Sequence, residues 1–167
     1  MTRKRIFGLA TMAVVLFVST ASTNAQEQGI SQAAAAKLES LLVGAQQICP
    51  ITGKGLTKMG GPVKATVGEQ TVFLCCKGCF KGEISKQHWG QIQANLMAAQ
   101  GKCPVMGKPL PENPASIVVS GRKVFVCCPP CTNKIKAEPG RYLAIVDRFL
   151  EENLARQATR PNVGQPR

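Results

Sequence analysis

The sequence predicts an α+β protein built from two small tandem modules, each with a cysteine knuckle, a β-hairpin and a helix, and with additional helices flanking them. The first observation is that all eight cysteines fall into two matching sets, which are Cys49, Cys75, Cys76 and Cys79, then Cys103, Cys127, Cys128 and Cys131. The second is that two β-branched runs precede each cysteine triplet. The third is that apolar residues at helical spacing follow each triplet. A repeated unit of about fifty residues accounts for all three observations.

The match extends beyond the cysteines themselves. The octapeptide CPITGKGL at 49–56 corresponds to CPVMGKPL at 103–110, and the run VF precedes a cysteine triplet in both copies. The leading cysteines are 54 residues apart and the triplets 52, so the first copy has two extra residues between them. We expect this insertion in the hairpin turn, near 67–70 and opposite 120–122. Both copies have turn residues there, and a change of two residues keeps every strand side chain on its original face.

The first 25 residues have the pattern of a secretory signal. Residues 3–5 are basic, residues 6–18 are apolar, and residues 23–25 form a small-residue cleavage site. A retained membrane anchor is the alternative, but the uncharged run ends in several Ser, Thr and Asn residues. We therefore expect cleavage, a mature chain that starts near Gln26, no integral membrane segment after cleavage, and a periplasmic or secreted protein.

The net charge of the chain limits the kinds of partner that we expect. Removal of the signal segment takes away three positive charges and lowers the formal net charge from +12 to +9. A basic protein outside the cytoplasm meets anionic envelope surfaces or acidic proteins. The basic residues are scattered and are not interleaved with aromatic residues, so nucleic acid is not expected as a partner. The expected partners are metal ions, with a metal-transfer protein or an anionic envelope surface beside them.

Five segments describe the predicted organisation of the chain. They are a signal segment at 1–25, an N-terminal helical segment at 26–48, module 1 with a linking helix at 49–100, module 2 with a C-terminal helix at 101–155, and a disordered tail at 156–167. The tail is assigned to disorder because it is rich in Pro, Gly and polar residues.

The residue pattern also predicts individual helices and strands. A helix at 31–46 has Ser31 as its N-cap and leucines at helical spacing. Hairpins are expected at 63–67 with 71–74 and at 116–120 with 123–126, and short helices at 78–86 and 132–137, the latter stopped by Pro139-Gly140. Longer helices carry two apolar stripes that we expect to lie in the core: Trp89, Ile92, Leu96 and Ala99, then Tyr142, Ile145, Val146, Phe149 and Leu150.

We expect the cysteines to stabilise these modules, through bound metal, disulfides or both. Each module is near the size at which a hydrophobic core alone is marginal, and the whole chain has eight aromatic residues. Four cysteines equal the ligand count of a closed tetrahedral thiolate site, and a helix start after the triplet favours thiolate over thiol. Adjacent Cys75 and Cys76 point to opposite faces if both lie in the strand, so either can act with Cys79 beside Cys49. The same choice stays open for Cys127 and Cys128.

The order of these motifs resembles that of a known family. A turn of the form C-P-x-x-G, followed by V-F-x-C-C-x-x-C where a hairpin meets a helix, is similar to the TRASH and YHS-type heavy-metal-binding modules, here present twice in an expected exported bacterial-type protein. The helix opening of that family matches Pro139-Gly140-Arg141-Tyr142 in copy two, whereas copy one has Gln87-His88-Trp89. The family's early ligand and its C-x-x-x-C pair fall on Cys49, Cys75 and Cys79, and on Cys103, Cys127 and Cys131.

This resemblance covers residues 49–90 and 103–145. It implies two treble-clef-like modules that bind a soft ion, Cu(I) or Zn(II), one per module, in sensing, trafficking or resistance. The second cysteine of each triplet, Cys76 or Cys128, is an addition to the family pattern. We predict a metal buffer, carrier or sensor-like partner without catalysis of its own, with all eight cysteines as candidate ligands.

Two other functions compete with metal binding. A disulfide-stapled interaction scaffold would suit an exported chain, and eight cysteines permit 105 pairings. A thiol-disulfide oxidoreductase could use the Cys-x-x-Cys pairs 76–79 and 128–131, although no thioredoxin-like βαβ unit precedes them. His88 and Met106 could be soft-metal ligands, but neither has a counterpart in the other copy, so a surface or gap-filling role is the preferred interpretation. No Ser-His-Asp set, paired carboxylates or phosphate loop is evident.

Overall fold

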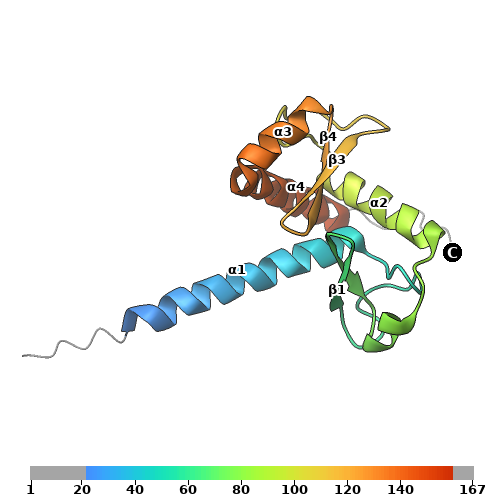
Figure 1. The fold of residues 1–167 in the computed structure, drawn as a ribbon. Coiled ribbons are helices and arrows are strands. Elements are labelled where there is room, and N and C mark those ends of the chain that lie inside the picture. Colours follow the sequence, from blue (N-terminus) through green and yellow to red (C-terminus); the bar gives the residue numbers. More distant parts are fainter. Residues whose placement is uncertain (1–21, 160–167) are drawn as a thin grey trace, which may run out of the picture. The chain divides into compact units, whose positions relative to one another are not determined.

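The computed structural model describes residues 22–159 and has the predicted α+β architecture, with two separate antiparallel hairpins among helices (Figure 1). Residues 35–159 form one compact unit, which includes the C-terminal part of α1. The elements in chain order are α1 (Ser22–Gln46), β1 (Val63–Val67), β2 (Gln70–Leu74), the 3₁₀ helix η1 (Lys77–Lys81), α2 (Lys86–Gln100), β3 (Ala115–Val119), β4 (Arg122–Val126), α3 (Pro130–Ala137) and α4 (Pro139–Thr159).

Both ends of the described chain differ from the prediction. Helix α1 begins at Ser22, so Ser31 lies inside the helix and is not its N-cap. The expected signal segment lies outside the described residues except for its last four, which begin α1. Helix α4 continues to Thr159, so the disordered tail is wrong for 156–159, and 160–167 lie outside the described residues. Among the described helices, none combines the length and apolar character that a membrane span requires.

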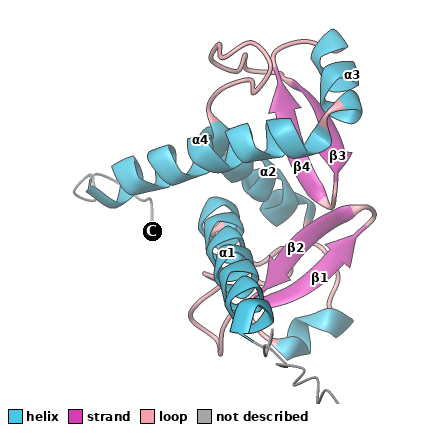
Figure 2. Ribbon diagram, turned by 90° about the vertical axis from the view of Figure 1, so that its left-hand side faces the viewer, coloured by secondary structure: helices cyan, strands magenta, loops and turns pink. Residues whose placement is uncertain are grey.

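Figure 2 shows the two antiparallel hairpins, and their strands and turns have the same lengths in both modules. Each has two five-residue strands joined by a two-residue turn, with Val67 opposite Gln70 in one and Val119 opposite Arg122 in the other. The insertion is therefore not in the turn. The extra residues lie in the loop before the hairpin, which has six residues (57–62) in module 1 and four (111–114) in module 2. A loop accepts two residues without any change in strand register.

The helices after the triplets also differ from each other. The expected helix at 78–86 is wrong: η1 ends at Lys81, the chain is extended at Gly82 (φ −92°, ψ 158°), and α2 begins at Lys86. Ser85 is the N-cap of α2, because its side chain accepts a hydrogen bond from the backbone N–H of His88. In module 2 the helix α3 begins two residues earlier than expected and ends before Pro139, as predicted.

Two hydrophobic cores hold the unit together. The core of module 1 packs Leu56, Phe73 and Leu74 around its cysteines, and that of module 2 packs Val124, Val126 and Ile135 around its own. Leu42 of α1 contacts both cores. The predicted stripes lie in this interior, with Ile92, Ala99, Tyr142, Val146 and Leu150 buried and their other members half-buried.

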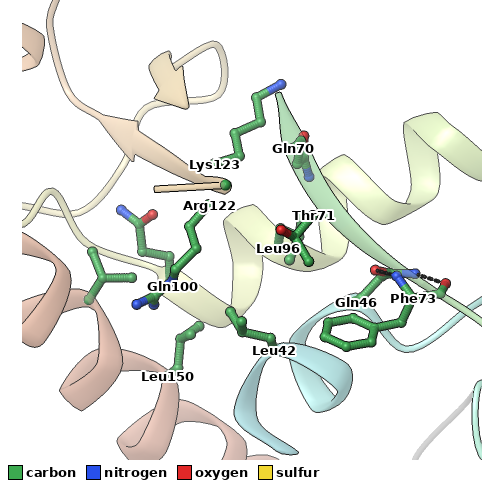
Figure 3. A pocket seen from close by; sticks show the side chains of 12 residues that line it. Leu42, Gln46, Gln70, Thr71, Phe73, Leu96, Gln100, Arg122, Lys123 and Leu150 are labelled. Carbon is green, nitrogen blue, oxygen red and sulfur yellow. Dashed lines mark hydrogen bonds between the residues drawn. The ribbon is translucent and has the colours of Figure 1, made fainter. Parts of the chain in front are cut away.

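A buried glutamine closes the outer edge of each hairpin. The Gln46 side chain accepts a hydrogen bond from the N–H of Phe73 (2.8 Å) and donates one to the C=O of the same residue (2.7 Å). Gln100 does the same for Phe125, at 2.9 and 2.6 Å. A side-chain amide that pairs with both backbone groups of one residue replaces a neighbouring strand at an edge. Figure 3 shows the Gln46–Phe73 pair beside the cavity that both glutamines line.

The two modules touch along β2 and β4. The N–H of Thr71 donates a 2.7 Å hydrogen bond to the C=O of Gly121, the turn glycine of the second hairpin. A cavity of about 40 Å³ lies behind this contact and is lined by residues of α1, β2, α2, β4 and α4. Helix α2 also packs against α4, as Figure 2 shows. Asn153 of α4 donates to the C=O groups of Ala99 and Gln100, and Asn95 of α2 donates to that of Gln46.

Candidate metal centres

Each candidate centre starts from a tight turn that presents the leading cysteine. The N–H of Cys49 donates to the C=O of Lys54 and the N–H of Gly53 donates to the C=O of Cys49, both at 2.9 Å. The turn at Cys103 has the same two bonds, with Lys108 and Gly107, both at 2.8 Å. The turn closes on a glycine with positive φ in each case, which a glycine adopts without steric cost.

The second part of each centre is the cysteine triplet at the end of a strand. In module 1, β2 ends at Leu74 and runs directly into Cys75 and Cys76. Cys76 is itself extended (φ −164°, ψ 165°), so the two adjacent thiols leave the backbone on different sides. Helix η1 then returns the chain so that the Cys79 Sγ lies 3.6 Å from both of their sulfurs.

The structure brings together, in each module, the three cysteines on which the pattern of the resembled family falls. The Sγ atoms of Cys49, Cys75 and Cys79 all lie within 4.8 Å of one another, and so do those of Cys103, Cys127 and Cys131. This part of the prediction is confirmed. Cys76 and Cys128 stand outside these two groups of three, and each is half-buried and approaches only part of its group.

The sulfur spacings suit a single soft ion. A zinc–sulfur bond of about 2.3 Å places thiolates about 3.8 Å apart in a tetrahedron and about 4.0 Å apart in a trigonal plane. The Sγ–Sγ distances are 3.8 Å for Cys49–Cys79 and 3.6 Å for Cys75–Cys79 in module 1, and 4.0 Å for Cys127–Cys131 in module 2. An ion can therefore bind three sulfurs at once with sub-ångström adjustments.

Backbone donors surround the leading thiol. Burial raises the pKa of Cys49, but hydrogen bonds from the backbone of Thr52, Cys75 and Ile51 outweigh it and bring the pKa down to about 7. The Cys103 pKa is lowered in the same way against its burial, by the backbone of Cys127, Met106 and Val105. Amide donors stabilise a thiolate over a thiol, and a thiolate is the form that binds metal.

The last cysteine of each triplet has the opposite environment. Burial and the neighbouring thiols Cys75, Cys76 and Cys49 raise the pKa of Cys79 to about 12. Burial and Cys128 raise the pKa of Cys131 as well. Several thiolates cannot stay charged side by side in a low-dielectric interior unless a cation compensates them. A bound cation removes this conflict.

Metal binding at module 1 is expected to weaken as the pH falls. Near neutral pH an ion must displace the proton of Cys79, and below about pH 7 it must also displace that of Cys49. These two thiols alone make the affinity fall at least about tenfold per pH unit above pH 7 and at least about a hundredfold per unit below it. Competition against a chelator of known affinity at several pH values measures this slope, and a pH-independent affinity would contradict it.

The two other candidate ligands of the sequence lie outside the groups of three. His88 is half-buried, its Nδ1 is buried without a hydrogen-bond partner, and its ring lies against Gly53 of the first turn. Met106 is 52% exposed. Its counterpart Thr52 places Oγ1 3.4 Å from the Cys75 Sγ, so this position of the turn borders the sulfurs.

The contact of His88 predicts unequal costs for the same substitution in the two turns. Gly53 and Gly107 have φ of +67° and +68°, so alanine is strained at either by about 1 kcal/mol. A Cβ on Gly53 would also lie 2.6 Å from the His88 Nε2, whereas a Cβ on Gly107 meets nothing within 4 Å. Gly53→Ala should therefore lower the unfolding free energy more than Gly107→Ala in urea titrations. In a protein that already carries His88→Ala, Gly53→Ala should cost no more unfolding free energy than Gly107→Ala. If Gly53→Ala still costs more there, the contact with His88 is not the reason.

Sequence reasoning missed the polar residues that support the sulfurs. Gln46 and Gln100 fix the strands that lead into the triplets, and the Thr52 hydroxyl contacts a cysteine directly. A signal was present, because a glutamine stands three residues before the leading cysteine in both copies. Comparison of the chain with family models, curated proteins and solved structures gives no match.

Proposed function

We propose that this is an exported soft-metal-binding protein that holds one Cu(I) or Zn(II) ion in each module and acts as a buffer, carrier or sensor-like partner. The observation that carries the proposal is the pair of three-sulfur groups, each with all its Sγ atoms within 4.8 Å of one another. In this proposal the modules are treble-clef-like and related to the TRASH and YHS-type modules. The ligands are the two groups of three, and Cys76 and Cys128 are additional thiols at the rim.

Two features favour metal over structural disulfides. A disulfide joins two sulfurs, whereas Cys79 lies within 3.8 Å of three others, which is the arrangement of ligands around one centre. The leading thiols also accept hydrogen bonds from backbone amides. Such bonds stabilise the negative charge of a thiolate, and a disulfide sulfur carries no such charge.

One distance favours a second candidate function. The Cys128 and Cys131 sulfurs are 3.2 Å apart, the shortest sulfur pair among the described residues, and Cys131 lies in the first turn of α3. A thiol-disulfide oxidoreductase uses a Cys-x-x-Cys pair placed in this way. Reduction of insulin by the purified, metal-free protein tests this activity.

The metal proposal is tested by metal analysis and a free-thiol count on protein purified from its native compartment without chelator. Two equivalents of copper or zinc per chain, with thiols that become titratable once the metal is removed, would support it. Protein without metal and without free thiols, before and after denaturation, would replace it with the disulfide scaffold. Intact mass of the exported protein tests the compartment, since cleavage should leave a chain that starts near Gln26.

A further inference from the structure

The two turns differ at one position that borders the sulfurs. Thr52 and Met106 are each the third residue after the leading cysteine, in turns with the same backbone hydrogen bonds. The Thr52 Oγ1 lies 3.4 Å from the Cys75 Sγ. A γ atom at this position thus already touches the first thiol of the triplet. A methionine has its sulfur one bond beyond the γ atom, so the Met106 Sδ can reach an ion held by these thiols.

Met106 is free to make that contact. Its side chain is 52% exposed, and it lies outside the residues packed in the core of module 2. Its backbone is held at the centre, because it donates a hydrogen bond to the Cys103 sulfur. The first thiol of the triplet is also more open in module 2, since Cys127 is half-buried whereas its counterpart Cys75 is fully buried. Met106 is therefore a large apolar side chain that gains little stabilisation from packing at its position.

We propose that Met106 is a thioether ligand of a Cu(I) ion bound by Cys103, Cys127 and Cys131, so that module 2 is the copper-preferring site of the two. The inference rests on the proposed metal-binding function and specifies the ion at one site. Thioether sulfur is soft and neutral, and it favours Cu(I) over Zn(II). It binds without releasing a proton and adds no negative charge. In module 1 the Thr52 hydroxyl hydrogen-bonds a thiol and offers no soft donor.

The two turns allow reciprocal substitutions, each in a chain with a single site. Module 2 is isolated in Cys49→Ser/Cys79→Ser, and module 1 in Cys103→Ser/Cys131→Ser. In the first background, Met106→Thr and Met106→Leu should lower Cu(I) affinity at least about tenfold and leave Zn(II) affinity nearly unchanged. In the second, Thr52→Met should raise Cu(I) affinity relative to Zn(II). Anaerobic competition with a chromophoric Cu(I) chelator and with a fluorescent Zn(II) chelator gives both constants.

A direct readout of the bond comes from the full-length protein with selenomethionine in place of methionine. X-ray absorption at the selenium edge should show a copper neighbour after Cu(I) loading, and Met106→Leu should abolish it. Equal Cu(I) affinity with and without Met106, or selenium without a copper neighbour, would overturn this inference while two bound ions per chain leave the proposed function standing. Failure of both single-site chains to bind either ion would overturn the proposed function and this inference together.

Discussion

Cys49→Ser is expected to halve the metal content of the protein, from two ions per chain to one. The substitution removes one of three sulfurs that surround a common point in module 1, and a serine hydroxyl does not ionise to replace it. Structural zinc contributes on the order of 10 kcal/mol to small domains that depend on it, so the loss should also destabilise the module. Hydrogen exchange should accelerate in residues 49–81 and stay slow in 103–137. Metal analysis and exchange are measured in reducing buffer, where disulfides cannot form.

Two matched variants make this result decisive. Cys103→Ser should produce the mirror image, with exchange accelerated in module 2 only. Cys76→Ser removes the thiol that stands outside the group of three and should retain two ions per chain. If Cys49→Ser kept both ions, or if it lost both, two separate three-sulfur sites could not be correct.

Gln46→Leu is expected to lower the unfolding free energy by about 3 kcal/mol. Leucine has nearly the same volume but leaves the N–H and C=O of Phe73 buried without partners, at about 1–3 kcal/mol for each group. Gln100→Leu should cost a similar amount through Phe125. Urea unfolding of metal-saturated protein in reducing buffer measures both.

The control for the glutamine variants is Gln87→Leu at an exposed position of α2, which should change stability by less than about 0.5 kcal/mol. Gln46→Glu separates the two hydrogen bonds, since a carboxylate can accept from the N–H of Phe73 but repels its C=O. It should be at least as destabilising as Gln46→Leu. Near-neutral effects of both Gln46 variants would show that water replaces the side chain at this edge.

The elements that depend on local pattern could be predicted closely. Alternating apolar residues and turn glycines fixed the hairpins to within one residue, and the stripe from Tyr142 to Leu150 marked the buried face of α4. The start of α1 could not be predicted, because Ala33–Ala36 favours helix without marking an end, and the signal pattern suggested a break before it. The insertion was misplaced because the loop at 57–62 and the hairpin turn both contain glycine.

The candidate site shows the same division between local and tertiary information. The cysteine spacing left Cys75 and Cys76 as alternatives beside Cys49 and Cys79, and only the resemblance to a known family pointed to the three thiols that meet in each module. The role of Gln46 was not visible, because its partner Phe73 lies 27 residues away and glutamine is ordinarily a surface residue. Likewise, the contact between His88 and Gly53 depends on how α2 returns to the first turn, which no spacing rule specifies.

Helix α2 belongs to both halves of the molecule at once. Its Asn95 holds the carbonyl of Gln46 for the first hairpin, and its Gln100, five residues later, pairs with Phe125 of the second. If the chain were cut between residues 100 and 101, the second fragment would lack Gln100, which is the hydrogen-bond partner of Phe125. A fragment that ends before residue 95 would likewise leave the Gln46 carbonyl open. Two fragments that each keep these hydrogen bonds must therefore both include α2, and they overlap along its length instead of meeting at a linker.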